Sequence, residues 1–134
     1  ATGILITGAE EFGLAGARIF ARLDTTTSRA AVAVNLDTID DEGALYLVSH
    51  DRPGTALARL EASRLSLAGL SPHTHRLPLG ILVDSLPLAR AGIPSITIGR
   101  LTWRTLRLIH TPRDTAEGLT LAMAREIGRA LAVN

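Results

Sequence analysis

Apolar residues along this chain follow two different spacings. Short apolar runs, as in 4–6 and 32–34, alternate with segments such as 17–23, in which apolar residues recur every three or four positions. The short runs are typical of buried strands, and the periodic segments are typical of helices with one apolar face. The pattern predicts strands over 3–8, 31–36, 44–49 and 94–98, a short one over 81–83, and helices over 12–23, 53–67, 85–91 and 114–131.

This alternation of strands and helices indicates an α/β fold. We expect three layers, with a mostly parallel mixed sheet and helices on both of its faces. The helix over 53–67 has Pro53 in its first turn, where proline is favoured. Its residues Leu57, Leu60 and Leu65 predict one apolar stripe toward the core.

Two polar segments are predicted to lie outside these elements. Residues 69–80 contain several glycines and prolines and predict a surface loop. This loop contains His73 and His75, which could chelate a metal, or replace missing ligands of another site, only if the backbone were extended. The acidic run 40–43 has the composition of a solvated turn, and His50 is expected to be an ordinary surface residue.

Composition narrows the class of protein. The chain has 134 residues, of which 46% are hydrophobic but only 3% aromatic, so it has enough aliphatic side chains for the core of one domain. It has no cysteine, which excludes disulfides and thiolate metal sites. The net charge of +1 argues against nucleic acid as a partner, and no apolar stretch of about 18 residues predicts a membrane helix. We expect a soluble protein, either cytoplasmic or secreted.

Acids and a histidine stand at the ends of predicted strands. Glu10 and Glu11 follow the first strand, Asp37 follows the second, and His110 stands just ahead of a helix start. Each has an ordinary interpretation as a helix-terminus acid, a turn residue or a surface histidine. Together they would lie at the carboxyl ends of strands, where open α/β sheets bind ligands. Carboxylates with an imidazole form a ligand set that suits zinc.

Five segments occur in an order that is specific when taken together. They are Gly-Ala-Glu-Glu-Phe-Gly-Leu-Ala-Gly at 8–16, Asn-Leu-Asp at 35–37, Val-Asp-Ser-Leu-Pro-Leu at 83–88, Ala-Gly-Ile-Pro at 91–94 and His-Thr-Pro-Arg-Asp-Thr at 110–115. On these segments the chain resembles the C-terminal portion of the co-catalytic zinc aminopeptidase family. That family includes bacterial leucyl-type aminopeptidases, glutamate carboxypeptidases and glutaminyl cyclases. The resemblance implies a single zinc-peptidase-like domain over 1–134, shortened at its N-terminus.

The resemblance also implies roles for individual residues. Glu10 corresponds to the general base that takes a proton from the attacking water. Glu11 and His110 correspond to ligands of one zinc ion, and Asp37 corresponds to a ligand of the other. Asp84 corresponds to an acid close to the site that does not bind the metal.

Further positions are implied around the substrate. Gly92, Ile93 and Pro94 would shape the turn into a strand beside the substrate pocket. Many family members have a tyrosine shortly before the His-Thr pair that helps to stabilise the oxyanion. Trp103 or a neighbouring arginine is the candidate to replace it here. The arginines at 100, 104 and 107 form either a solvated face or a site for a substrate carboxylate.

The chain departs from the family pattern in its first residues and in one motif. The family supplies a histidine ligand and a bridging aspartate ahead of the glutamate pair, whereas residues 1–7 contain neither. Ser85 stands where the family usually has histidine, and Leu88 stands where phenylalanine is usual. We therefore expect weak or absent zinc binding by this chain alone. It could be a fragment, one of two polypeptides that complete the site, or a shortened inactive relative.

The expected function is that of a zinc-dependent peptidase that hydrolyses N-terminal peptide bonds through a metal-activated water. The expected partners are a peptide substrate and a second polypeptide or further copy that covers the missing part, since the exposed edge of strand 3–8 should pair with something. Neither nucleic acid nor a membrane is expected as a partner. Two alternatives are an inactive relative that serves as a binding or assembly module, and a one-zinc acyltransferase like glutaminyl cyclase.

Overall fold

The computed structural model describes residues 3–23, 32–39, 42–76, 83–109, 111–117 and 120–132. No helix in these ranges has the length and apolar character needed to cross a membrane. In chain order the elements are η1 (Glu10–Phe12), α1 (Ala15–Ala21), β1 (Ala33–Ile39), β2 (Ala44–Ser49), α3 (Arg52–Leu67), β3 (Pro72–Arg76), α4 (Ser85–Arg90), β4 (Ser95–Leu101), α5 (Trp103–Leu108) and α6 (Ala122–Ala132).

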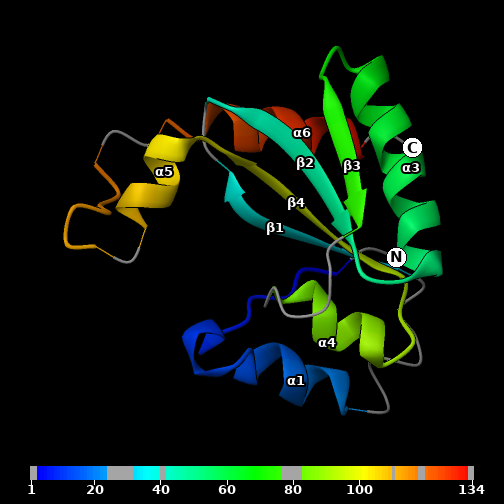
Figure 1. Ribbon diagram of the computed structural model, residues 1–134. Coiled ribbons are helices and arrows are strands. Elements are labelled where there is room, and N and C mark those ends of the chain that lie inside the picture. Colours follow the sequence, from blue (N-terminus) through cyan, green and yellow to red (C-terminus); the bar gives the residue numbers. More distant parts are fainter. Residues whose placement is uncertain are drawn as a thin grey trace.

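The four strands form one mixed sheet in the order β1-β4-β2-β3. β1 pairs with β4 in parallel and β2 pairs with β3 in parallel, whereas β2 and β4 are antiparallel. The expected mixed α/β sheet is therefore confirmed. Figure 1 shows α3 and α6 beside the sheet, and α4 and α1 gathered near the end of the sheet where β2 ends and β4 begins.

One face of the sheet is aliphatic and carries the main core. Because side chains alternate along a strand, Leu45 and Leu47 of β2 lie on the same face as Ile96 and Ile98 of β4. These side chains are buried against α3 and α6 in one cluster, whose buried members also include Leu57, Ala58, Leu65 and Ile127. The opposite face presents Asn35 and Thr97, and α4 contacts it through Ser85.

Helix α3 begins as the sequence predicts, and its buried stripe differs in one residue. Asp51 caps the helix by accepting a hydrogen bond from the Gly54 backbone N–H at 2.7 Å. Leu57 and Leu65 are buried as expected, but Leu60 is 52% exposed. The buried stripe passes instead through Glu61, which is four residues from each buried leucine.

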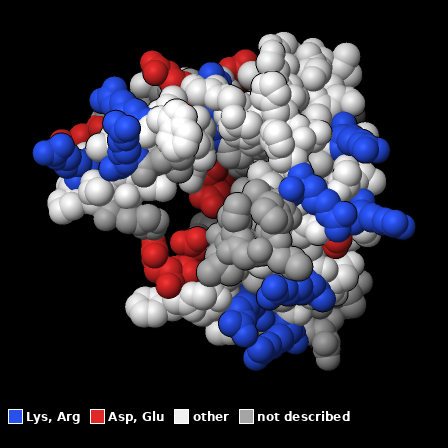
Figure 2. Space-filling view, in the orientation of Figure 1, with Lys and Arg blue, Asp and Glu red and all other residues white. Residues whose placement is uncertain are grey.

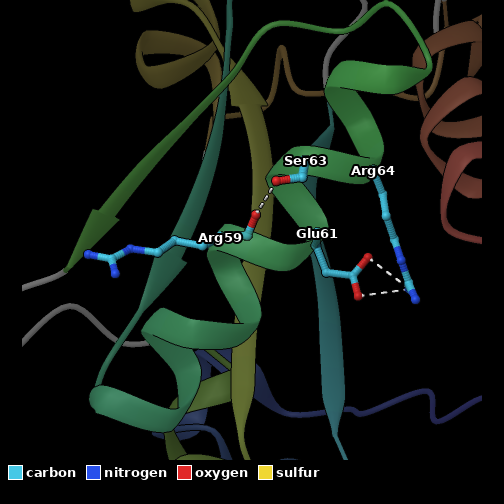
Figure 3. Close-up of polar contacts among 4 residues, drawn as sticks. All are labelled: Arg59, Glu61, Ser63 and Arg64. Carbon is cyan, nitrogen blue, oxygen red and sulfur yellow. Dashed lines mark hydrogen bonds and ion pairs between the residues drawn. The ribbon is translucent and has the colours of Figure 1, made fainter.

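Glu61 is a charged residue on this buried stripe. Its side chain is paired with Arg64, whose Nη1 lies 3.1 Å from Oε1 of Glu61 (Figure 3). Figure 3 also shows a neighbouring hydrogen bond of the helix, from Ser63 Oγ to the Arg59 carbonyl. The ion pair gives the buried carboxylate a charged donor, without which its burial would be costly. A stripe predicted from apolar residues alone therefore misses this position.

The first predicted strand is absent. Residues 3–9 run without pairing to any described strand, and Ile4 and Ile6 are 92% and 90% exposed. The predicted helix over 12–23 is divided into η1 and α1, because Gly13 and Leu14 adopt left-handed φ values of 72° and 61°. The apolar run identified a sequence that can form a strand, but a strand also needs a neighbour.

Other boundaries differ more modestly. Residues 72–76, expected within a loop, form β3 and pair with β2, so that His73 and His75 lie beside Tyr46 with ring centroids 5.9 and 5.5 Å away. The final helix begins at Ala122 rather than at 114. The strand over 44–49 is confirmed, those near 31 and 94 begin and end later, and α5 lies in a stretch expected to be irregular. Residues 40–41 and 81–82 lie outside the described residues.

Two leucines on α3 provide a matched test of this packing. We expect Leu65→Ala to lower the free energy of unfolding by about 2–5 kcal/mol, because Leu65 is fully buried in the main cluster. Leu60→Ala should cost about 0.5 kcal/mol or less, because that side chain is largely solvated. Both changes replace Leu by Ala in the same helix, so urea unfolding of the two variants isolates burial. Equal losses would contradict the packing described here.

Candidate functional site

The loop over residues 8–16 presents two adjacent carboxylates. Glu10 and Glu11 open the short helix η1 and are both exposed. Ala9 before the helix has a φ of 57°, a left-handed value that is unfavourable for a residue with a Cβ atom. The backbone is then folded back on itself, because Gly16 donates from its N–H to the Gly8 carbonyl at 3.1 Å. A Cβ atom at Gly16 would lie 2.5 Å from that carbonyl oxygen, so this loop requires glycine there.

The loop is attached to the rest of the molecule through α4. Leu14 and Ala17 of the loop and α1 form a small buried cluster with Leu86 of α4. Ahead of the loop, the Thr7 hydroxyl donates a hydrogen bond to Oδ2 of Asp84. The other carboxylate oxygen, Oδ1 of Asp84, is buried and has no hydrogen-bond partner among the described residues. Asp84 thus lies next to the segment that carries the glutamate pair, and it does not cap α4 with its side chain.

Asp37 lies at an irregular point of β1. The pairing of β1 with β4 shifts register between Leu36 and Ile39, and Thr38 has a φ of 51°. Asp37 Oδ1 accepts a hydrogen bond from the Thr38 hydroxyl at 3.0 Å. The Asp37 carbonyl oxygen would lie 3.1 Å from a Cβ atom at Gly99, so β4 passes close to this point. Such irregularities redirect side chains at the ends of strands.

Figure 2 shows acidic side chains gathered in a recess between the α5 region and the α1–η1 region, with basic side chains over α5. Trp103, the first residue of α5, is 81% exposed. In the nearby cluster of arginines, Arg100 donates from Nε to the Gly43 carbonyl at 3.0 Å, which anchors it to the turn before β2.

The turn from α4 into β4 contains Gly92, Ile93 and Pro94. Gly92 has a φ of 85°, Ile93 is buried, and the Pro94 carbonyl accepts from the Ala33 N–H at 2.9 Å. These residues therefore connect the end of α4 to the start of both β4 and β1. Whether they border a substrate pocket stays a prediction.

The described residues do not assemble a zinc centre by themselves. They contain no group of three or more histidine, cysteine, aspartate or glutamate side chains that could hold a metal ion. Neither Glu11 nor Asp37 therefore belongs to such a group among the described residues, and His73 and His75 do not join Glu11 to form one. His110, the expected imidazole ligand, lies outside the described residues.

The structure also connects polar residues to which the sequence assigned no role together. The expectation that His50 is an ordinary surface residue is wrong, because its side chain is half-buried and its Nε2 lies 3.0 Å from the Ser85 hydroxyl. Ser85 Oγ lies 2.7 Å from Thr97 Oγ1, which accepts from Asn35 Nδ2 at 3.2 Å. We call these four residues the relay. One sequence signal was available: Thr97 interrupts the isoleucines of a strand otherwise expected to be apolar.

The environment of His50 favours the neutral ring. Burial lowers the pKa of His50 below its usual value of 6.5, the nearby Asp51 carboxylate opposes this, and Arg90 adds to it. With a neutral ring, Nε2 can accept a hydrogen bond from the Ser85 hydroxyl.

Known proteins resemble this chain both in sequence and in structure. A family model described as peptidase family M28 matches residues 3–134. BSAP, a zinc aminopeptidase from Bacillus subtilis, is similar in structure with a TM-score of 0.73 and 21% identity, over 93% of this chain and 34% of that chain. The LapA aminopeptidase of Legionella pneumophila gives a TM-score of 0.72 and 19% identity, over 94% and 36%.

An aminopeptidase from Aneurinibacillus sp. strain AM-1 gives a TM-score of 0.65 and 25% identity, over 93% of this chain and 31% of that chain. The chain thus spans about a third of the length of the solved structures it matches. No curated protein matches it. The shared architecture confirms the expected α/β fold.

The buried histidine predicts how stability responds to acid. Because the pKa of His50 is lower in the folded protein, the unfolded chain binds the proton first as the pH falls below 6.5. The contribution of His50 to the free energy of unfolding is therefore present above pH 6.5 and decreases as the pH falls toward the folded pKa. Urea unfolding at intervals from about pH 7.5 to about pH 5.5 should show a flatter decrease for His50→Gln than for wild type. Values near pH 7.5 give the cost of the substitution itself, and parallel curves would contradict the assignment.

Proposed function

The chain belongs to peptidase family M28, and from this membership we propose that it is part of a zinc-dependent aminopeptidase. The substrate would be a peptide, hydrolysed at its N-terminal bond. The observation that carries the proposal is the adjacent pair Glu10 and Glu11, exposed on η1 within a segment that the family model matches. One carboxylate can then handle protons while its neighbour binds a cation.

Glu10 is the proposed general base. It would accept a proton from the attacking water and return it to the leaving amine, a task that a positioned carboxylate performs well. Its exposure on a turn held by the Gly8–Gly16 contact supports this role, because water reaches the carboxylate while the backbone beneath it is constrained.

Zinc is the cofactor that we propose for the complete site. Glu11 and His110 would be ligands of one zinc ion and Asp37 a ligand of a second, and the remaining ligands would come from other polypeptide. Asp84 would act on the site indirectly, through its hydrogen bond with Thr7.

An apolar surface supports the proposal that further polypeptide completes the enzyme. Ile4, Ile6 and Phe12 are 92%, 90% and 83% exposed, and all three belong to the segment that contains the glutamate pair. Burying side chains of this size contributes about 1.5–3 kcal/mol each. We propose that the polypeptide that covers this surface also supplies the remaining zinc ligands, either from the same chain or from a second one.

The general base is tested by Glu10→Gln in the complete, zinc-loaded protein. We expect kcat to fall by about 10²–10⁴-fold on a chromogenic aminoacyl anilide, with zinc content unchanged, because the amide cannot accept the proton. Glu42→Gln, at another exposed glutamate, should retain wild-type turnover. Undiminished turnover by the Glu10 variant would exclude this role. If the wild-type protein cyclises an N-terminal residue instead of hydrolysing the bond, the acyltransferase alternative is correct.

The metal is tested by Glu11→Gln and Asp37→Asn. Loss of a partner that only orients a ligand typically weakens metal affinity by 10–100-fold, so loss of a ligand should cost at least about 10-fold. Elemental analysis after dialysis against graded zinc buffers measures this, and Glu117→Gln is the control at an exposed acid elsewhere. A native protein of confirmed mass without zinc would instead identify the inactive assembly module, which the exposed apolar surface also supports.

A further inference from the structure

The relay connects segments that carry different parts of the candidate site. Asn35 of β1 and Thr97 of β4 are register partners on the polar face of the sheet. Asp37 is two residues beyond Asn35 on the same strand, just past the point where the pairing of β1 with β4 loses its regular register. Ser85, at the other side of Thr97, is the first residue of α4. The relay therefore joins the strand of Asp37 directly to the start of α4.

From α4 the connection continues to the glutamate pair. Asp84 precedes Ser85 and accepts a hydrogen bond from Thr7, which lies three residues before Glu10. The buried cluster around Leu86 holds α1, on the other side of η1, against the same helix. The loop that presents Glu10 and Glu11 is thus attached to α4 both before and after η1, and α4 is attached to the sheet at Ser85.

We propose that Ser85, held between Thr97 and His50, is a positioning residue that fixes the Glu10–Glu11 pair relative to Asp37. The effect of this positioning on catalysis rests on the proposed function. Ser85 is fully buried and Thr97 is 4% exposed, so neither hydroxyl can exchange its partner for bulk water. Ser85 itself is too deeply buried to meet a substrate, and its effect is exerted through the position of α4.

The hydrogen bonds of the relay can all run in one direction. The Asn35 amide donates to Thr97, the Thr97 hydroxyl donates to Ser85, and the Ser85 hydroxyl donates to Nε2 of His50. Each hydroxyl then donates once and accepts once, which satisfies both. Besides Ser85, the groups that act on His50 are Asp51 and Arg90, and the neutral ring that burial favours is the form this direction requires.

Thr97→Val is the decisive variant, because it replaces the hydroxyl by a methyl group of nearly the same shape. In the complete zinc-loaded peptidase we expect kcat to fall by about 10–100-fold with a smaller change in KM, since misplacement of catalytic groups by about 1 Å can cost 10²-fold. Thr97→Ser keeps the hydroxyl and should restore most of kcat. Thr74→Val, at an exposed threonine of β3 that faces away from the relay, is the matched control.

A second readout does not depend on activity. In heteronuclear NMR spectra of this chain, Thr97→Val should shift the backbone amide signals of Glu10, Glu11 and Asp37 and the His50 ring nitrogens, whereas Thr74→Val should not. If wild type proves inactive but these shifts appear, the proposed function fails and the positioning connection stands. If Thr97→Val and Thr97→Ser behave alike, or if the Glu10 and Glu11 signals do not move, the positioning role is overturned. If Thr97→Val does not fold, His50→Ala replaces it, because His50 is at the half-buried end of the relay. We expect this variant to shift the same backbone amide signals of Glu10, Glu11 and Asp37.

Discussion

Packing of α3 and α6 against one aliphatic face of the sheet is the constraint on which the other features depend. Leu47, Ile96 and Ile98 are fully buried there, together with Leu65 and Ile127 from the two helices. Because side chains alternate across a strand, residues that fill this core leave every second position of the same strands for the other face. The core thus fixes β2 and β4, with β1 paired alongside β4, while the intervening positions of these strands remain available for polar chemistry. A site built on rigid strands holds its geometry better than one built on loops.

The polar face uses those intervening positions in two ways. Asn35 and Thr97 form internal hydrogen bonds that attach α4, whereas Asp37 lies where the regular pairing of β1 is interrupted. The register shift after Leu36 and the left-handed Thr38 separate Asn35, which holds α4, from Asp37, because regular pairing between β1 and β4 ends between them. A similar division holds at the other acidic segment, where Gly13 and Leu14 separate η1 from α1. Regular structure supplies the anchor, and the irregular residue beside it presents the carboxylate.

Much of the fold could be predicted from local patterns, and the failures share a physical cause. The strand over 44–49 and the helix that starts near Pro53 were predicted correctly, because burial on one face gives each a clear period. Residues 3–8 have a strand-like composition but no strand beside them among the described residues, and Pro72–Arg76 looks like a loop but pairs with β2. Both outcomes depend on neighbours distant in sequence. The same holds in the site: the glutamate pair and Asp37 stand out as motif residues, whereas His50 and Ser85 acquire their meaning only from contacts across 35 positions.

The exposed apolar segment and the incomplete ligand set can be understood together under the proposed function. A zinc ion bound by few ligands of one polypeptide gains affinity when another surface supplies the rest, and that surface needs binding energy of its own to stay in place. Ile4, Ile6 and Phe12 offer such energy within the segment that carries Glu10 and Glu11. Apolar contact would bring the ligands together, and the metal would in turn stabilise the contact, so that assembly and metal binding are thermodynamically linked. Zinc affinity would then depend on the polypeptide that covers this surface. Until it is covered, α4, which is hydrogen-bonded to the sheet at Ser85, would keep the glutamate pair in position relative to Asp37.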